Sequence, residues 1–222
     1  MSASQFQLET YFNKIHSRWP ISAIINKQDW LAVGCSHTAG YGVAKEETYI
    51  SQLSRHYDRP IHNAAIGTGN HAVCYHNIVL WLEKYGSPEL IIAQWPNPIR
   101  RTIWYNNNGE LHTVSSSDNL LHAMVKAGQN NFYVDWMSSI FAANHLCKQL
   151  RINIINILLE NIDLEYNKIL NDRGITLHQD EKLPGKSWIF DSAGSDDQHH
   201  SARCHQLWSE RVIGIIDELT TR

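Results

Sequence analysis

Residues Trp30–Gly40 read WLAVGCSHTAG, an apolar run that ends in a cluster of small and polar residues. The apolar part, residues 30–35, predicts a short buried β-strand, and the Gly, Ser and Thr residues after it predict a loop. A helical pattern follows from about residue 47 to residue 57. This part of the chain is therefore predicted to form a strand, a loop and a helix.

The same unit recurs along the sequence. Further strands are predicted at 61–66, 90–95 and 152–159, a short fifth strand at 187–190, a short helix or loop at 163–173, and helices at 72–85, 132–150 and 201–219. Strands that alternate with helices form a mainly parallel sheet covered on both faces, because each right-handed crossover places its helix on a face. We therefore predict an α/β fold with three α/β/α layers and a flavodoxin-like, mainly parallel five-stranded sheet.

A single domain is expected to comprise residues 1–222, since no Pro-, Gly- or Ser-rich linker divides the chain. Residues 1–29 are predicted to form an amphipathic helical lead-in that ends near Trp19 and Pro20 and packs on the outside. Residues 99–129 are predicted to form an insertion with a hairpin around 104–109, where Asn-Gly is a strong turn signal. An insertion after a strand is well placed to be a lid.

Composition excludes several classes of function. Nineteen Lys and Arg against 22 Asp and Glu give a formal net charge of -3, so we expect no nucleic-acid partner. The longest apolar runs are far shorter than the roughly 20 residues of a membrane span, and the first residues do not resemble a secretion signal. We therefore expect a cytoplasmic protein with no membrane partner, whose four scattered cysteines are reduced and buried. The sequence leaves the oligomeric state open.

Polar side chains gather where the predicted strands end, which is the edge at which such sheets carry their chemistry. Ser36 follows the first strand between glycines, so its hydroxyl can project and its backbone N–H can point at an oxyanion. Asp196 precedes His199 by three residues on a loop before the last helix, which lets the carboxylate orient the ring. Each segment also has a plainer interpretation, with Ser36 as a turn residue and Ser201 as the cap of the last helix.

Together the two segments resemble the sequence blocks of the SGNH, or GDSL-type, hydrolases. Gly34–Gly40 resembles the GDSxTxG block that carries the nucleophile of that family, and Asp196–His199 resembles its terminal DxxH block. The following residues, His200–His205, match the family's later Ser and His, which makes His199 rather than His200 the aligned histidine. The order of the two blocks along the chain agrees with the family as well.

Two middle blocks can also be placed. The family's Gly block, which follows the second strand, resembles residues 62–70, with Gly67 as the backbone donor or Gly69 if the register shifts. The Asn block, GxND, resembles residues 95–98 and makes Asn97 a side-chain donor. The resemblance covers about residues 30–215, and its value lies in the ordered set of four blocks.

The resemblance implies a serine esterase with an acyl-enzyme intermediate. Ser36 would attack an ester carbonyl, and His199 would act as the general base, oriented by Asp196. The Ser36 and Gly67 N–H groups and the Asn97 amide would form the oxyanion hole. No metal and no organic cofactor is implied, and the expected partner is a small-molecule ester with a short acyl or acetyl group, or an acylated carbohydrate. The candidate substrate-binding residues are Trp95, His37, Arg100 and Trp104.

Three other interpretations stay open. Cys35 occupies the position of the Asp in the family's nucleophile block, and Trp95 and Pro98 occupy the positions of the Gly and the Asp in GxND. These differences leave open a relative that binds its ligand without catalysis. A zinc-dependent hydrolase is the second interpretation, because Cys204 and several histidines crowd together before and within the last helix. The third is a non-catalytic flavodoxin-like module whose glycine loops contact a nucleotide or a sugar.

Overall fold

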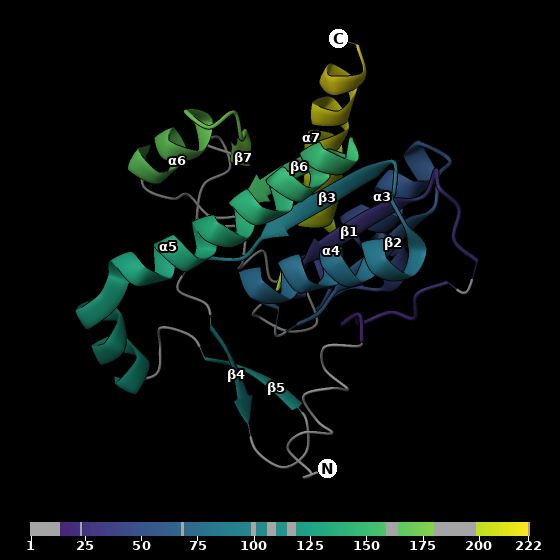
Figure 1. Cartoon of the computed structure of the whole chain (residues 1–222). Helices are drawn as coiled ribbons and strands as arrows, with labels where there is room; N and C mark the ends of the chain where they lie inside the picture. Colours follow the sequence, from purple (N-terminus) through teal and green to yellow (C-terminus); the bar gives the residue numbers. More distant parts are fainter. Residues whose placement is uncertain are drawn as a thin grey trace, which may run out of the picture.

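The computed structural model describes residues 14–22, 24–67, 69–98, 101–105, 110–114, 119–158, 164–179 and 199–221 (Figure 1). Along the chain its elements are β1 (Trp30–Gly34), α2 (Ser36–Ala39), η1 (Lys45–Glu47), α3 (Tyr49–His56), β2 (Ile61–Ala65), α4 (His71–Tyr85), β3 (Leu90–Trp95), β4 (Arg101–Tyr105), β5 (Glu110–Val114), α5 (Asn119–Leu150), β6 (Asn153–Leu158), α6 (Leu164–Asn171), β7 (Leu177–Gln179) and α7 (Ala202–Thr220). The predicted alternation of strands and helices is therefore confirmed.

Five parallel strands form the central sheet in the order β2-β1-β3-β6-β7. The predicted three-layer fold with a five-stranded parallel sheet is confirmed. The fifth strand, however, is β7, whereas the sequence predicted it at 187–190, a segment that lies outside the described residues. β7 has only three residues, LHQ, and this pattern is too short to stand out as an apolar run.

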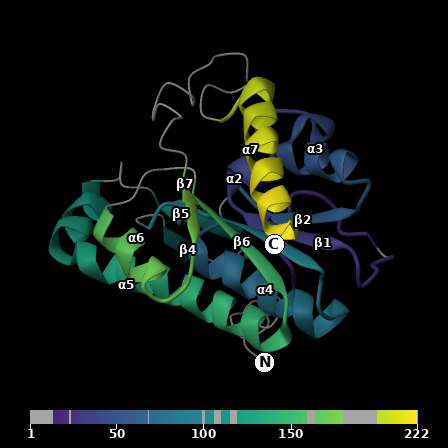
Figure 2. The same cartoon turned by 90° about the horizontal axis from the view of Figure 1, so that it is seen from above.

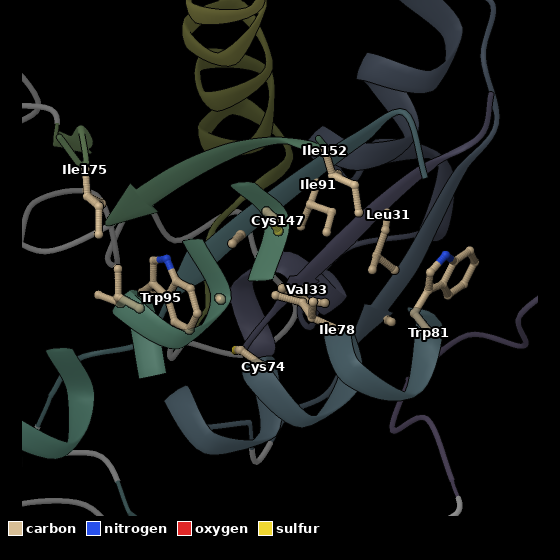
Figure 3. Packing of buried hydrophobic residues seen from close by; sticks show 14 of the residues in the cluster. Leu31, Val33, Cys74, Ile78, Trp81, Ile91, Trp95, Cys147, Ile152 and Ile175 are labelled. Atoms are coloured by element: carbon tan, nitrogen blue, oxygen red, sulfur yellow. The ribbon is translucent and has the colours of Figure 1, made fainter. Parts of the chain in front are cut away.

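Helices cover the sheet on both faces, with α4 and α5 on one side and α3 and α7 on the other, as Figure 2 shows from above. Side chains of β3 alternate between the two cores, because successive residues of a strand point to opposite faces. Ile91, Ala93 and Trp95 belong to the core under α4 and α5, part of which Figure 3 shows. Leu90 and Ile92 belong to the core under α3 and α7.

The lead-in before β1 differs from the sequence prediction. Residues 1–13 lie outside the described residues, and the described part of 14–29 contains no helix. Its backbone binds the domain instead: the His16 N–H donates to Asn77 Oδ1 at 2.9 Å, and the Arg18 N–H donates to the Ala65 carbonyl at 2.9 Å. These bonds to α4 and β2 replace the bonds that a helix would make with itself, so tertiary contacts decide the conformation here.

The predicted hairpin in the insertion is confirmed, since β4 and β5 pair antiparallel in a separate two-stranded sheet. Helix α5 begins at Asn119, however, much earlier than the predicted residue 132. Its first turns therefore occupy residues that the sequence assigned to the insertion at 99–129. Residues 128–131, GQNN, include one glycine and two asparagines, which are weak helix formers, and the long helix accommodates them.

All four cysteines are free and buried, as the sequence predicted. Among the described residues, none of the helices combines the length and the apolar character needed to cross a membrane.

Candidate active site

The strand order reverses at β1, which has β2 on one side and β3 on the other. In parallel sheets, ligands bind beyond the carboxyl ends of the strands at such a switch point. The pairing of Gly34 with Ala65 and of Val33 with Ala93 brings the ends of the three strands to the same edge. Ser36, Gly67 and Asn97 each follow one of these strands, so this edge is where the predicted oxyanion donors lie.

Ser36 is the first residue of α2, directly beyond the end of β1, and only 4% of its surface is exposed. Cys35 forms the cap before it and is also buried. The Ser36 carbonyl accepts the N–H of Tyr41 at 3.0 Å, which closes the short helix into a tight turn. We call residues 35–41 the nucleophile turn.

Two backbone N–H groups at this edge are available for a ligand. Within the described part of the chain, no acceptor takes the N–H of Ser36 or that of Gly67. The N–H of Gly69, by contrast, donates to the Ile66 carbonyl at 2.9 Å. Of the two glycines that the sequence left open, Gly67 is therefore the one whose N–H remains free to bind an oxyanion.

Asn97 lies two residues beyond β3 and is half-buried. The loop that carries it is held from α5, because the Trp136 indole N–H donates to the Pro96 carbonyl at 2.9 Å. Pro98 on the other side of Asn97 is buried. The backbone on both sides of Asn97 is thus packed into the domain, which restricts where its amide can point.

The ring of His199 lies against the nucleophile turn. Its centroid is 5.7 Å from the ring of His37 and 5.6 Å from the ring of Tyr41, and it is half-buried. His37 is the immediate neighbour of Ser36 in the sequence, so the ring of His199 lies next to the turn that carries the candidate nucleophile. Asp196, the predicted orienting carboxylate, lies outside the described residues.

His200 occupies a different environment from His199. It is buried, and its ring lies 4.1 Å from that of His37. Burial and the neighbouring His199 lower the pKa of His200 to about 4, so at neutral pH its ring is uncharged and enclosed. Ser201 caps α7 by accepting the Cys204 N–H at 3.3 Å, as the plainer interpretation of this segment predicted. The interpretation of Ser201 as the cap of the last helix is therefore confirmed, and the half-buried His199 lies two residues before this cap.

The crowded histidines do not form a metal centre in the part of the chain that the structure describes. No group of three or more His, Cys, Asp or Glu side chains there is arranged to hold an ion. The rings of His37 and His200 are tilted against each other, with 4.1 Å between their centroids and 33° between their planes.

Trp95 was predicted as a candidate substrate-binding residue, but the structure places its side chain in the core. Its side chain is fully buried among the core residues under α5, and its indole N–H donates to Asn156 Oδ1 at 2.9 Å (Figure 3). The alternation of side chains along β3 turns position 95 into the core, away from the edge. Arg100 and the side chain of Trp104, the other aromatic and basic candidates, lie outside the described residues.

Tyr41 and Arg18 are residues of this edge that the sequence did not single out. A Cβ atom placed on Gly67 would lie 2.7 Å from Cζ of Tyr41, so the tyrosine ring packs directly on the candidate donor. The Arg18 guanidinium lies 4.5 Å from the same ring and donates to the carbonyls of Ala39 and Gly40. The Tyr41 signal was present in the sequence, as an aromatic residue between two glycines, but nothing there indicated the approach of Arg18.

Comparisons with known proteins agree with this architecture. No protein-family model and no curated protein sequence matches the chain. Among solved structures, a lipolytic protein of the G-D-S-L family from Desulfitobacterium hafniense superposes with a TM-score of 0.53 at 14% identity, covering 83% of this chain and 97% of that one. A member of the same lipolytic family from Veillonella parvula gives 0.52 at 11% identity, covering 85% and 97%.

An acetyl xylan esterase from Butyrivibrio proteoclasticus gives a TM-score of 0.55 at 12% identity, covering 90% of this chain and 66% of that one. These likenesses rest on structure, since so few residues are identical. This chain therefore has the three-layer α/β/α fold of the solved G-D-S-L lipolytic proteins and of the acetyl xylan esterase.

Proposed function

We propose that this chain is a serine hydrolase that cleaves a carboxylic ester through an acyl-enzyme. The observation that carries the proposal is the position of the His199 ring, which packs beside the nucleophile turn at the switch point of the sheet. The ordered sequence blocks and the shared fold of the G-D-S-L lipolytic proteins support it independently.

The proposed reaction begins when His199 takes the proton of the Ser36 hydroxyl and the oxygen attacks the ester carbonyl. The tetrahedral oxyanion receives hydrogen bonds from the N–H groups of Ser36 and Gly67 and from the amide of Asn97. His199 then gives its proton to the leaving alcohol, and the acyl group stays on Ser36. A water molecule, activated by His199, then attacks the acyl-enzyme in the same way and releases the acid. Asp196 is assigned the role of orienting the His199 ring.

A short acyl group, such as acetyl, is proposed for the substrate. The support comes from Tyr41, whose ring lies on Gly67 and limits the space beside the candidate oxyanion donor. An acylated carbohydrate is proposed as the alcohol part, because an acetyl xylan esterase is among the proteins that share the fold.

The test measures hydrolysis of p-nitrophenyl acetate by the purified protein together with labelling by a fluorophosphonate probe. Ser36→Ala should abolish both turnover and labelling, and His199→Ala should reduce turnover to near the background rate. Peptide mapping of the labelled protein should place the probe on Ser36. Turnover that is equal in wild type and in both variants would refute the proposal, and so would a probe on another residue.

Ser139→Ala is the matched control for the nucleophile. Ser139 on α5 also contacts a histidine, since its oxygen lies 3.0 Å from Nδ1 of His71. Its hydroxyl donates to the Asp135 carbonyl at 3.2 Å, so the oxygen accepts from His71 and is not activated by it. We expect Ser139→Ala to retain turnover, which distinguishes a serine at the switch point from a serine that merely touches a histidine.

A further inference from the structure

We infer that Tyr49 is a positioning residue, which ties the nucleophile turn to the start of α7 and thereby sets the distance between Ser36 and His199. The inference rests on the proposed function, and it assigns a role to residues outside the catalytic set. It arises from a chain of buried hydrogen bonds that joins β3, α2, α3 and α7, four elements that meet beneath the site.

The first link holds the nucleophile turn to the sheet. Oε1 of Gln94 accepts three hydrogen bonds from the turn: the Cys35 N–H at 3.2 Å, the Cys35 thiol at 3.1 Å and the Thr38 hydroxyl at 3.0 Å. Gln94 is buried, so these bonds are not exchanged with water. Gly34 makes this approach possible, because a Cβ atom there would lie 2.3 Å from the Thr38 hydroxyl oxygen.

The second link joins the turn to α3. The hydroxyl oxygens of Thr38 and Tyr49 lie 2.9 Å apart. The single proton of the Thr38 hydroxyl is directed at Gln94, so the Tyr49 hydroxyl must be the donor of this bond. Burial raises the pKa of Tyr49, which keeps its hydroxyl protonated and able to donate.

The third link joins α3 to α7. The backbone N–H of Tyr49 donates to Nδ1 of His205 at 3.3 Å, and the two rings stack with 13° between their planes. Burial lowers the pKa of His205 to about 3, so its Nδ1 can remain an acceptor at neutral pH. His205 lies in the first turn of α7, whose cap Ser201 follows directly after His199 and His200.

Tyr49 therefore contacts the turn that carries the candidate nucleophile with its hydroxyl, and the helix that follows the candidate base with its ring and N–H. Both contacts are buried, so neither adjusts freely when the other moves. Because a misplacement of about 1 Å at reacting groups costs about 100-fold in rate, the loss of one contact should be measurable in the chemical step.

The experiment compares Tyr49→Phe with Tyr57→Phe. Tyr49→Phe removes only the hydroxyl and keeps the ring against His205. Tyr57 closes the far end of the same α3–α7 interface, where its hydroxyl oxygen lies 3.2 Å from the Ile213 carbonyl oxygen and 2.9 Å from Asp217 Oδ1, so its one proton is shared between two acceptors. It thus controls for the general loss of a tyrosine hydroxyl between these helices.

The readouts are the rate of fluorophosphonate labelling of Ser36, kcat and KM for p-nitrophenyl acetate, and the thermal unfolding temperature. Tyr49→Phe should lower kcat and the labelling rate about 10- to 100-fold with KM little changed. Tyr57→Phe should leave both rates within about twofold of wild type, although its unfolding temperature falls. Thr38→Val should match Tyr49→Phe, and Thr38→Ser, which keeps the hydroxyl, should restore most of the rate.

Several outcomes would overturn the inference. If wild-type Ser36 is labelled and Tyr49→Phe is labelled at the same rate, Tyr49 has no positioning role, while the proposed function stands. If Tyr49→Phe and Tyr57→Phe lower the rates equally and in proportion to stability, the role of Tyr49 is only structural. If the wild-type protein is neither labelled nor active, the proposed function and the inference fail together.

Discussion

Acidification from pH 7 to pH 5 should destabilise this protein through His200 and His205, the two buried histidines at the start of α7. Burial lowers the pKa of His200 from 6.5 to about 4 and that of His205 from 6.5 to about 3. Between these values and 6.5 the unfolded chain binds protons that the folded chain does not. The free energy of unfolding therefore falls as the pH falls below about 6.5, and the loss stops once the folded pKa is passed.

The size of the loss at pH 5 does not depend on how far the folded pKa values are lowered. Both lie a unit or more below pH 5, so the folded protein takes up almost no proton there, and only the ordinary value of 6.5 enters. At 1.36 kcal/mol per pH unit, the interval from 6.5 to 5 is worth about 2 kcal/mol for each histidine. Together the two residues should cost about 4 kcal/mol, a large part of the stability of a typical domain.

Urea unfolding followed by tryptophan fluorescence at pH 7 and pH 5 measures this loss. His200→Asn and His205→Asn should each reduce it by about 2 kcal/mol, and in the second variant the introduced amide oxygen can still accept the N–H of Tyr49. His56→Asn is the control, because His56 is exposed and should leave the loss unchanged. The reasoning fails if wild type is equally stable at both pH values, or if both variants lose as much as wild type.

Three further predictions concern the site. Asn97→Ala should lower kcat for p-nitrophenyl acetate about 100- to 1000-fold, about 3 to 4 kcal/mol, and an unchanged kcat would remove Asn97 from the oxyanion hole. Gly67→Ala places a Cβ against the side chain of Tyr41 and should reduce turnover more than stability. Gly69→Ala places a Cβ 2.7 Å from the Gly34 carbonyl oxygen and should mainly lower the unfolding temperature. If kinetics and thermal unfolding show the opposite pattern, Gly67 is not the oxyanion donor. Trp95→Phe should lower the free energy of unfolding in urea by about 1 to 2 kcal/mol and leave KM unchanged. A raised KM without a loss of stability would indicate that Trp95 contacts the substrate.

The sequence predicted the parts of the fold that long apolar patterns encode. The strands β1, β3 and β6 are five or six residues long and largely buried, so each one was visible in the sequence as a mostly apolar run. β7 was missed because three residues carry no periodicity, and the predicted helix was extended through residues 14–19 because apolar spacing does not reveal that Asn77 binds the backbone of His16. Local patterns cannot register such distant partners.

The site was predicted less completely for a similar reason. Ser36, Gly67 and Asn97 follow directly from strand ends, which a sequence reveals, and the structure places all three at one edge. The orientation of a side chain at the last position of a strand depends on its register, and this is why Trp95 was assigned to the pocket. Gln94 carried a visible signal, as a polar residue in the otherwise apolar strand LIIAQW, but its partners in the turn were not visible.

Cys35 stands where the GDSL-type sequence block has Asp, and this difference is compatible with the proposed role of Ser36, because Gln94 gives the Cys35 side chain a hydrogen-bond partner. The Oε1 atom of Gln94 faces position 35 as an acceptor, and the Cys35 thiol meets it as a donor. A carboxylate in that place would set two acceptors against each other in a buried site, so Cys35 and Gln94 form a matched pair. Since side chains alternate along β3, the register that turns Gln94 toward the nucleophile turn also turns Trp95 into the opposite core. Two departures from the GDSL-type pattern thus have one structural cause, and neither of them blocks the edge where Ser36 and His199 lie.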